Sequence, residues 1–589
     1  MKFLLVAVNA KYIHSNLAVR CLKSYAKKYK DEIEIREYTI NHQLDDIVKD
    51  IYLRKPDVIG FSCYIWNIVY VKQLLGELPK LLPGIKLWLG GPEASFEAKM
   101  LLEEFPQITG ILLGEGEKTF LNLMKYYKGV LLSLSEIDGL FYRDQMEVFK
   151  TREPQDQLDM DTIPFFYENL EDLKHKIIYY ESSRGCPYSC SYCLSSVESP
   201  PHPRSAENIN KKVRFRDREL VKTELDFFLK NEVLQVKFTD RTFNCKHSHA
   251  IAIWEHILEH DNGITNFHFE VSADLLNEEE LRLLEKMRPG LMQLEVGVQS
   301  TALKTIKEIR RTMDLEKLKA NVTRIHSYGN IHLHLDLIAG LPYEDYESFA
   351  HSFNEIYALM PEQLQLGFLK VLKGSYMHQM ADRYGIVYKN IPPYEVLYTK
   401  WISYEELLAL KGLEEMVEIY YNSRQYSTTM GELVKCFPTS FHMYESLSAY
   451  YEEFHLFDRC LSRLEKYEVL FNFITVYAPN KLEMFRDLLM YDLYLREKIK
   501  SRPSFSKDQS PYKSAIKNFF MKEETVERYL SGYDGYTSKQ ISNMTHIEVF
   551  SRDGKEEYIL FDYQNRDPLT YNAKTFKISG EDLWTEYKR

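Results

Sequence analysis

The stretch that decides the fold is Glu181-Ser182-Ser183-Arg184-Gly185-Cys186-Pro187-Tyr188-Ser189-Cys190-Ser191-Tyr192-Cys193. It follows a short apolar run at residues 177–180, so three cysteines lie on a loop at the end of a predicted strand. Tetrahedral zinc sites use four ligands, usually in paired C-x2-C units, and this C-x3-C-x2-C loop contains one such pair. Three thiolates suit a 4Fe-4S cluster in which one iron keeps an open position. A structural zinc loop, with Cys245 as the nearest fourth ligand, is the alternative.

Strand and helix patterns alternate after this loop, which indicates repeated β/α units. Short motifs stand where the predicted strands end, and they include Thr239-Asp240-Arg241 and Asp336-Leu337-Ile338-Ala339-Gly340-Leu341-Pro342. The six predicted strands cover residues 177–180, 233–238, 267–271, 291–298, 332–337 and 363–368.

The chain before residue 129 has the pattern of a doubly wound parallel sheet. Near-continuous apolar strands alternate with amphipathic helices, which predicts a sheet covered on both faces. The predicted strands cover residues 3–8, 33–38, 58–61, 86–89 and 111–113. The predicted helices lie around residues 16–29, 43–54, 67–81, 94–105 and 117–127.

Glycine-rich turns follow three of these strands, where ligands of parallel sheets bind. They are Gly60-Phe61-Ser62-Cys63-Tyr64, Gly90-Gly91-Pro92 and Gly114-Glu115-Gly116-Glu117. Three such turns in register favour a ligand crevice, because glycine lets the backbone approach a ligand closely. Neither G-x-G-x-x-G nor G-x-x-x-x-G-K-[ST] follows the first strand, so a dinucleotide or nucleoside triphosphate is not the obvious ligand.

Length and charge narrow the functional classes. The 589 residues suggest three or four domains. A net charge of −11 disfavours nucleic-acid or anionic-membrane binding, which depends on excess Lys and Arg. No stretch has the pattern of a signal peptide or membrane span, and eight cysteines are too few for a disulfide scaffold. We therefore expect a cytoplasmic protein.

The cysteine loop, the six β/α repeats and the D-x-x-x-G-L-P motif resemble the radical S-adenosylmethionine (SAM) superfamily. With the N-terminal sheet and the segment Leu158-Asp159-Met160-Asp161-Thr162-Ile163-Pro164, residues 1–420 look like its cobalamin-dependent branch. The resemblance implies three cofactors: a 4Fe-4S cluster, SAM and cobalamin. It also implies a partial (β/α)6 barrel behind the Rossmann-like cobalamin-binding domain.

The resemblance carries over to individual positions, none of which it identifies as catalytic. The implied cluster ligands are Cys186, Cys190 and Cys193. The implied cobalamin-binding residues are Ser62, Tyr64, Gly90, Gly91, Gly114, Glu115 and Gly116. The implied SAM neighbours are Tyr192, Thr239, Asp240, Glu270, Ser272, Gln299 and Ser300.

Two departures from the family pattern leave alternatives open. The D-x-H-x-x-G motif that supplies a lower cobalt ligand is absent, so either His14 or the loop at residues 63–66 could lie against that face of the corrin. The G-G-E that often holds the SAM amino group is replaced by Thr239-Asp240-Arg241, and Asp240 is the candidate carboxylate.

We expect four segments along the chain. They are a cobalamin-binding domain (1–128), a connector (129–176), a radical SAM core (177–375) and a mainly helical C-terminal domain with a small β element (376–589). Helical patterns lie around residues 394–420, 443–456, 459–474 and 480–499, and the β element covers residues 547–551 and 558–563. The last domain is expected to cap the barrel, with its many tyrosines forming a core rather than a stacking surface.

The implied activity is methylation of an unactivated carbon (or phosphorus) through methylcobalamin, after SAM cleavage to a 5′-deoxyadenosyl radical. The alternative is a radical cyclisation or rearrangement without net methyl transfer. A methylthiotransferase needs a second cysteine trio, and only Cys21 and Cys63 precede Cys186. The implied partners are a small-molecule or peptide substrate and an electron donor such as flavodoxin or ferredoxin.

The substitution Cys190→Ala separates an enzyme from a cobalamin sensor. An enzyme should lose SAM cleavage entirely, because the cluster would lack one of its three ligands. A sensor should still bind cobalamin and respond to it. Reductive SAM cleavage, measured as 5′-deoxyadenosine, distinguishes the two outcomes.

Overall fold

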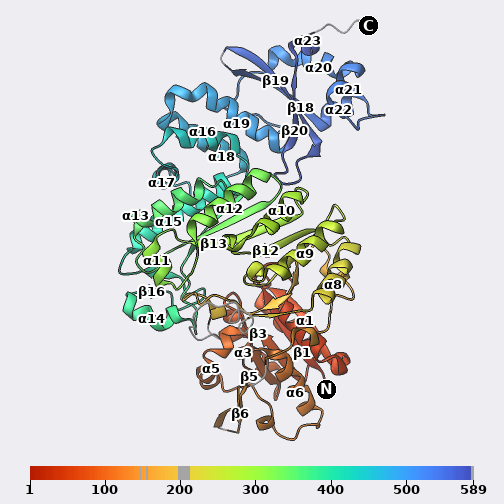
Figure 1. Ribbon diagram of the computed structural model, residues 1–589, viewed down its shortest axis with the longest axis vertical. Helices are drawn as coiled ribbons and strands as arrows, with labels where there is room; N and C mark the ends of the chain where they lie inside the picture. The colour runs from red at the N-terminus through yellow and green to blue at the C-terminus, as the bar shows by residue number, and fades with distance from the viewer. Residues whose placement is uncertain (146, 154–156, 197–212, 553, 585–589) are drawn as a thin grey trace. The chain divides into compact units, whose positions relative to one another are not determined.

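The computed structural model describes residues 1–145, 147–153, 157–196, 213–552 and 554–584 (Figure 1). The chain divides into two compact units. One comprises residues 1–346 and 367–404, and the other comprises residues 347–366 and 405–589. Among the described residues, no helix combines the length and apolar character that crossing a membrane requires.

The N-terminal sheet has seven strands in the order β2-β1-β3-β4-β5-β6-β7. The pairs from β2 to β5 are parallel, which confirms the doubly wound sheet, whereas β6 and β7 add antiparallel. The strands are β1 (Phe3–Asn9), β2 (Ile33–Thr39), β3 (Val58–Ser62), β4 (Lys86–Gly90), β5 (Ile108–Leu112), β6 (Leu140–Asp144) and β7 (Glu147–Lys150). The helices are α1 (Leu17–Tyr25), α2 (Leu44–Arg54), α3 (Ile68–Leu81), α4 (Pro92–Ser95), α5 (Ala98–Glu104) and α6 (Gly116–Tyr127).

Alternation along β1 explains why helices cover both faces of this sheet. Leu4, Val6 and Val8 join one apolar core, while Phe3 and Leu5 join a second. All five side chains are buried, as in a parallel sheet packed on both sides. Strands β6 and β7 come from the segment expected to be a connector, and their pairing with the sheet was not predicted.

A second sheet has six strands in the order β15-β14-β13-β12-β11-β8, as expected for six β/α repeats. Its strands are β8 (Ile178–Tyr180), β11 (Gln235–Phe238), β12 (Asn266–Glu270), β13 (Met292–Gln299), β14 (His332–Ala339) and β15 (Gln363–Phe368). Its helices are α8 (Arg218–Lys230), α9 (His247–Glu259), α10 (Glu278–Lys286), α11 (Leu303–Glu308), α12 (Leu315–Tyr328) and α13 (Tyr346–Tyr357). A short ribbon, β9 (Ser183–Arg184) with β10 (Arg214–Phe215), leads into the cysteine loop.

The C-terminal region is helical and ends in a three-stranded antiparallel sheet, which confirms the expected mixture. Tyr420, Tyr444 and Tyr451 are fully buried, so these tyrosines form a core. The helices are α14 (Tyr376–Tyr384), α15 (Tyr404–Val417), α16 (Ser427–Leu433), α17 (Ser440–Glu453), α18 (Arg463–Tyr477), α19 (Leu482–Arg496), α20 (Lys513–Met521), α21 (Glu523–Tyr529), α22 (Ser538–Met544) and α23 (Gly580–Trp584). The strands are β18 (Thr545–Arg552), β19 (Lys555–Arg566) and β20 (Ala573–Ile578).

Candidate functional site

A cavity of about 230 Å³ opens at the carboxyl ends of β3, β4 and β5, among α1, α6 and the sheet. Its deep walls are apolar and include Leu5, Val19 and Phe120. Six of the seven predicted cobalamin-binding residues line it: Ser62, Tyr64, Gly90, Gly91, Gly114 and Gly116. The structure therefore brings these six together around a single space.

Gly91 shows why this turn requires glycine. Its φ is +104°, and an added Cβ would lie 2.5 Å from the carbonyl oxygen of Cys63. Gly114 likewise has a positive φ of +61°. Glycine backbone beside an apolar cavity leaves room for a flat ligand group to approach closely. These residues therefore suit the tail of a cobalamin.

The two candidates for the lower corrin face differ in their surroundings. Nδ1 of His14 lies 2.7 Å from the hydroxyl of Tyr179 on β8, and burial lowers the pKa of this histidine. The rings of Tyr64 and Trp66 stack with centroids 4.5 Å apart, and the Trp66 indole donates to the carbonyl of Val8. His14 is thus engaged by the barrel, whereas Tyr64 lines the cavity.

The three cysteines lie on the loop after β9 and form no disulfide. Cys190 is buried, and Cys186 and Cys193 are partly exposed. Burial raises the pKa of Cys186 to about 11. Three thiols on one short loop, none of them in a disulfide, fit the ligand set of an iron–sulfur cluster with one open iron.

Arg311 supports this loop from the segment between α11 and α12 and was not predicted. Its guanidinium lies 3.8 Å from Sγ of Cys190 and 3.4 Å from the Tyr192 hydroxyl, and it also donates to the carbonyl of Gly297. A partly buried cation beside thiolates offsets part of their negative charge. Tyr192, a predicted SAM neighbour, therefore belongs to the packing of the cysteine loop.

Asp240 lies buried directly beneath the start of the same loop. Its carboxylate accepts bonds from the Ser182 amide, the Ser182 hydroxyl at 2.7 Å and the Ser183 hydroxyl at 2.5 Å. Burial raises its pKa to about 6, against the effect of these bonds. Its neighbour Thr239 donates to the Tyr180 carbonyl. Asp240 thus fastens the loop to the barrel, and Thr239 joins the end of β11 to β8.

The end of β13 carries a bulge at which the predicted residue Gln299 stands. Register with β14 shifts between Gly297 and Gln299, and Gln299 has a φ of +74°. The buried Oε1 of Gln299 has no hydrogen-bond partner. Next to it, the Ser300 hydroxyl donates to Glu344 at 2.5 Å. A strained backbone and an unsatisfied polar atom are typical of a ligand-binding position, which fits SAM.

The end of β12 supplies the remaining two predicted SAM neighbours. Burial raises the pKa of Glu270 to about 7, although Arg241 lies 3.9 Å away and opposes this shift. The Ser272 hydroxyl accepts from Tyr188 of the cysteine loop at 3.0 Å and donates to Asp274. Glu270 is therefore the acidic group of this region that titrates near neutrality.

Sequence reasoning missed a set of ionisable side chains in the middle of the barrel strands. Lys237 contacts Glu295 at 3.0 Å, and His268 contacts it at 2.9 Å. The pairing of β11 with β12 places Lys237 beside His268, and β12 pairs in turn with β13, which carries Glu295. Burial alone would raise the pKa of Glu295, but His268 and Lys237 hold it below its usual range. On β14, His334 pairs with Asp336 at 3.0 Å. We refer to these five residues as the lumen cluster.

Arginines beside the cysteine loop connect it to the cobalamin-type cavity. Arg184 pairs with Glu117 at 2.9 Å and with Glu181 at 2.7 Å. Arg214 holds Glu115 in a two-pronged ion pair, whose charge lowers the pKa of Glu115 despite the opposing effect of burial. Glu115 is the one predicted cobalamin-binding residue that does not line the cavity. The turn after β5 is thus ion-paired to both strands of the ribbon β9–β10.

Three protein families match consecutive parts of the chain. Residues 4–124 match the B12 binding domain, and residues 180–356 match the radical SAM superfamily. Residues 382–565 match a family described as a protein of unknown function (DUF4080).

Known proteins match part of the chain at low identity. The anaerobic magnesium-protoporphyrin IX monomethyl ester cyclase of Rubrivivax gelatinosus is 24% identical over 349 residues, covering 57% of this chain and 60% of that protein. The cobalamin-dependent radical SAM methyltransferase TokK of Streptomyces tokunonensis is 23% identical over 313 residues, covering 50% of this chain and 44% of that protein. The chain thus spans less than two thirds of either relative.

Solved structures share the fold. OxsB, a cobalamin-dependent SAM radical enzyme with aqua-cobalamin and SAM bound, gives a TM-score of 0.55 at 17% identity, covering 83% of this chain and 79% of that chain. The methyltransferase TsrM of Kitasatospora setae, with cobalamin and a 4Fe-4S cluster bound, gives 0.52 at 17% identity, covering 66% and 76%. The matched domains define a protein that combines a B12-binding domain with a radical SAM domain. Residues 4–124 thus belong to the B12-binding domain family, and residues 180–356 belong to the radical SAM superfamily.

The substitution Arg184→Met should weaken the link between the two domains. It leaves the buried Glu117 without its cation, which typically costs about 3 kcal/mol and should displace the turn after β5. We expect a lower urea midpoint and about tenfold weaker hydroxocobalamin binding. Lys80→Met, which removes an exposed ion pair with Glu77, is the matched control and should change neither. Identical behaviour of the two variants would contradict the assigned role of Arg184.

Proposed function

We propose that this chain is a radical SAM methylase that transfers a methyl group through cobalamin to an unactivated carbon. One observation carries the proposal: a B12-type cavity and a three-cysteine loop lie in one compact unit and are joined by Arg184. A sensor or carrier of cobalamin has no use for a loop that leaves one iron open to SAM.

The bound cofactors would supply one-electron cleavage of SAM and a methyl carrier, and the protein would hold and orient them. Cys186, Cys190 and Cys193 would ligate the cluster, with Arg311 balancing their charge. Gly91 and its cavity would take the cobalamin tail. Oε1 of Gln299 would accept a hydrogen bond from SAM, because this oxygen lacks a partner in the folded chain.

The lumen cluster supports a polar substrate. Lys237 and Glu295 keep 24% and 22% of their side-chain surface accessible, so a ligand could reach them from inside the barrel. Covering such charges with a purely apolar molecule costs several kcal/mol, because they would lose water without gaining partners. We therefore favour a substrate that carries hydrogen-bonding or charged groups.

Radical cyclisation is the second candidate, and a similarity to a cyclase supports it. The Rubrivivax gelatinosus relative is a cyclase, whereas TokK is a methyltransferase. The sequence identities of these two proteins to this chain are nearly equal. Both functions would use the same cofactor residues.

Reconstitution with iron, sulfide and hydroxocobalamin under anaerobic conditions tests the proposal. After addition of reductant and methyl-labelled SAM, a methylase should give labelled methylcobalamin and S-adenosylhomocysteine, detected by absorbance and mass spectrometry. Bound cobalamin with 5′-deoxyadenosine as the one product would favour the cyclisation. Failure to bind either cobalamin or a cluster would refute both candidates.

SAM binding should depend on pH through Glu270. Below its pKa of about 7 this carboxyl group is largely neutral, and above that value it is ionised and attracts the sulfonium cation. SAM affinity of the cluster-loaded, unreduced protein should therefore rise by up to about tenfold between pH 6 and 8. Glu270→Gln should abolish the change, and Glu278→Gln, at an exposed position of α10, should retain it. Equilibrium dialysis with labelled SAM measures the effect, and the same pH profile in Glu270→Gln would contradict it.

A further inference from the structure

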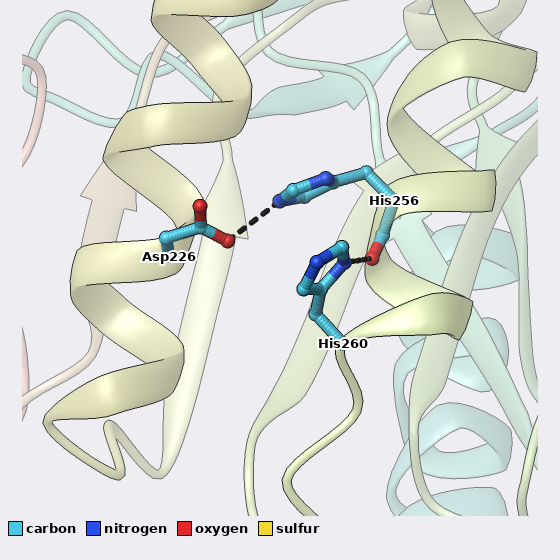
Figure 2. A group of neighbouring side chains, drawn as sticks. All are labelled: Asp226, His256 and His260. Carbon is cyan, nitrogen blue, oxygen red and sulfur yellow. Dashed lines mark hydrogen bonds and ion pairs between the residues drawn. The ribbon is translucent and has the colours of Figure 1, made fainter.

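Three metal-ligating side chains meet on the outer helices of the barrel, away from the cofactor site. Asp226 lies on α8, and His256 and His260 lie on and just after the last turn of α9 (Figure 2). One donor atom of each residue lies within 4.8 Å of the other two. In the part of the chain that the structure describes, no other three His, Cys, Asp or Glu side chains converge this closely.

The spacing of the two histidines places both imidazoles on one face of α9, because residues four apart on a helix are neighbours. Their rings stack with centroids 4.2 Å apart and planes inclined by 27°. Nε2 of His256 lies 2.7 Å from a carboxylate oxygen of Asp226, which joins α9 to α8. The group is therefore assembled from two separate helices.

A backbone contact orients His260 as a ligand. Its Nδ1 lies 3.0 Å from the carbonyl oxygen of His256, which accepts the Nδ1 proton. This leaves the lone pair on Nε2, and Figure 2 shows that nitrogen on the side facing Asp226 and His256. Metal-binding histidines commonly donate their second ring nitrogen to a carbonyl in this way, which fixes the tautomer.

We propose that Asp226, His256 and His260 bind a zinc ion that fastens α8 to α9, with water completing the coordination. Two imidazoles and a carboxylate are ligands that Zn²⁺ favours. Ligands 2.0–2.1 Å from a tetrahedral ion lie about 3.3 Å apart, so small side-chain rotations close the present spacing. Asp226 is 53% exposed and His256 is buried, so an ion can enter from solvent and be held against the helices.

Zinc binding at Nε2 of a neutral His256 requires the ring proton, which this nitrogen otherwise donates to Asp226, to move to Nδ1, so the bound imidazole stays neutral. The site is independent of the proposed function because none of its residues belongs to the cobalamin cavity or the cysteine loop. We expect zinc binding to act on the outer layer of the barrel, where Phe228 of α8 packs against Tyr180 of β8.

The test uses the full chain with its iron–sulfur cluster reconstituted, so that the loop cysteines are occupied, and zinc as the probe. Competition with a chromophoric chelator should show one zinc equivalent in the native protein. His260→Ala and Asp226→Asn, at exposed positions, should each weaken that binding by at least about tenfold. His351→Ala, at an exposed histidine of α13, is the matched control and should leave it unchanged.

X-ray absorption at the zinc edge supplies the second measurement. Nitrogen and oxygen scatterers at about 2.0 Å, without sulfur, are expected. Sulfur scatterers would place the ion at a cysteine and overturn the proposal. Zinc affinity in His260→Ala equal to that of the native protein would overturn it too, because Asp226 and His256 would then form only a helix-to-helix hydrogen bond.

Discussion

Arg184 is the side chain on which the arrangement of the two cofactor domains depends. It lies at the start of the cysteine loop, and its guanidinium pairs with Glu181 of the barrel and Glu117 of the N-terminal domain. Glu117 is almost fully buried, so its carboxylate needs this cation. Neither domain alone can satisfy both groups. The charges are therefore neutralised only when the glycine-rich turn after β5 and the cysteine loop lie together.

Such a buried ion pair does more to fix the relative positions of the two loops that it joins than to raise the free energy of unfolding. Removing two charges from water costs nearly as much as their attraction returns, whereas a wrong arrangement leaves one charge unpaired. A similar ion pair joins Arg214, on the other strand of the ribbon, to Glu115 of the N-terminal domain. Chemistry that passes a group between two cofactors requires their separation to be fixed, and these pairs fix the loops that would hold them.

The sequence predicted the sheets well because their signals are local. Apolar runs such as residues 3–8 and 58–61 have to be buried on both faces, and each became a strand. Strand β7 gave no such signal, because its side chains are mostly exposed and it pairs at the edge of the sheet. Glu115 stands in the expected glycine-rich turn, yet only the folded chain shows that Arg214 holds it.

The lumen cluster, which we propose contacts the substrate, shows why side chains that act together across several strands are harder to predict than residues in short motifs. Cofactor positions follow strand ends and short motifs, which can be read from one segment. Three different strands contribute Lys237, Glu295 and His334. In the sequence, each of these residues has the pattern of an ordinary polar residue in an alternating strand. They become one group only when the strands pair in register and curve around a common interior. The motif Asp336 to Pro342 was recognised at the end of its strand, but the ion pair of Asp336 with His334, two residues earlier on the same face of β14, is visible only in the structure. Because these charges neutralise one another in part, a bound substrate must replace existing partners as well as water. The barrel can therefore select for the pattern of hydrogen-bonding groups that a substrate carries, beyond its size.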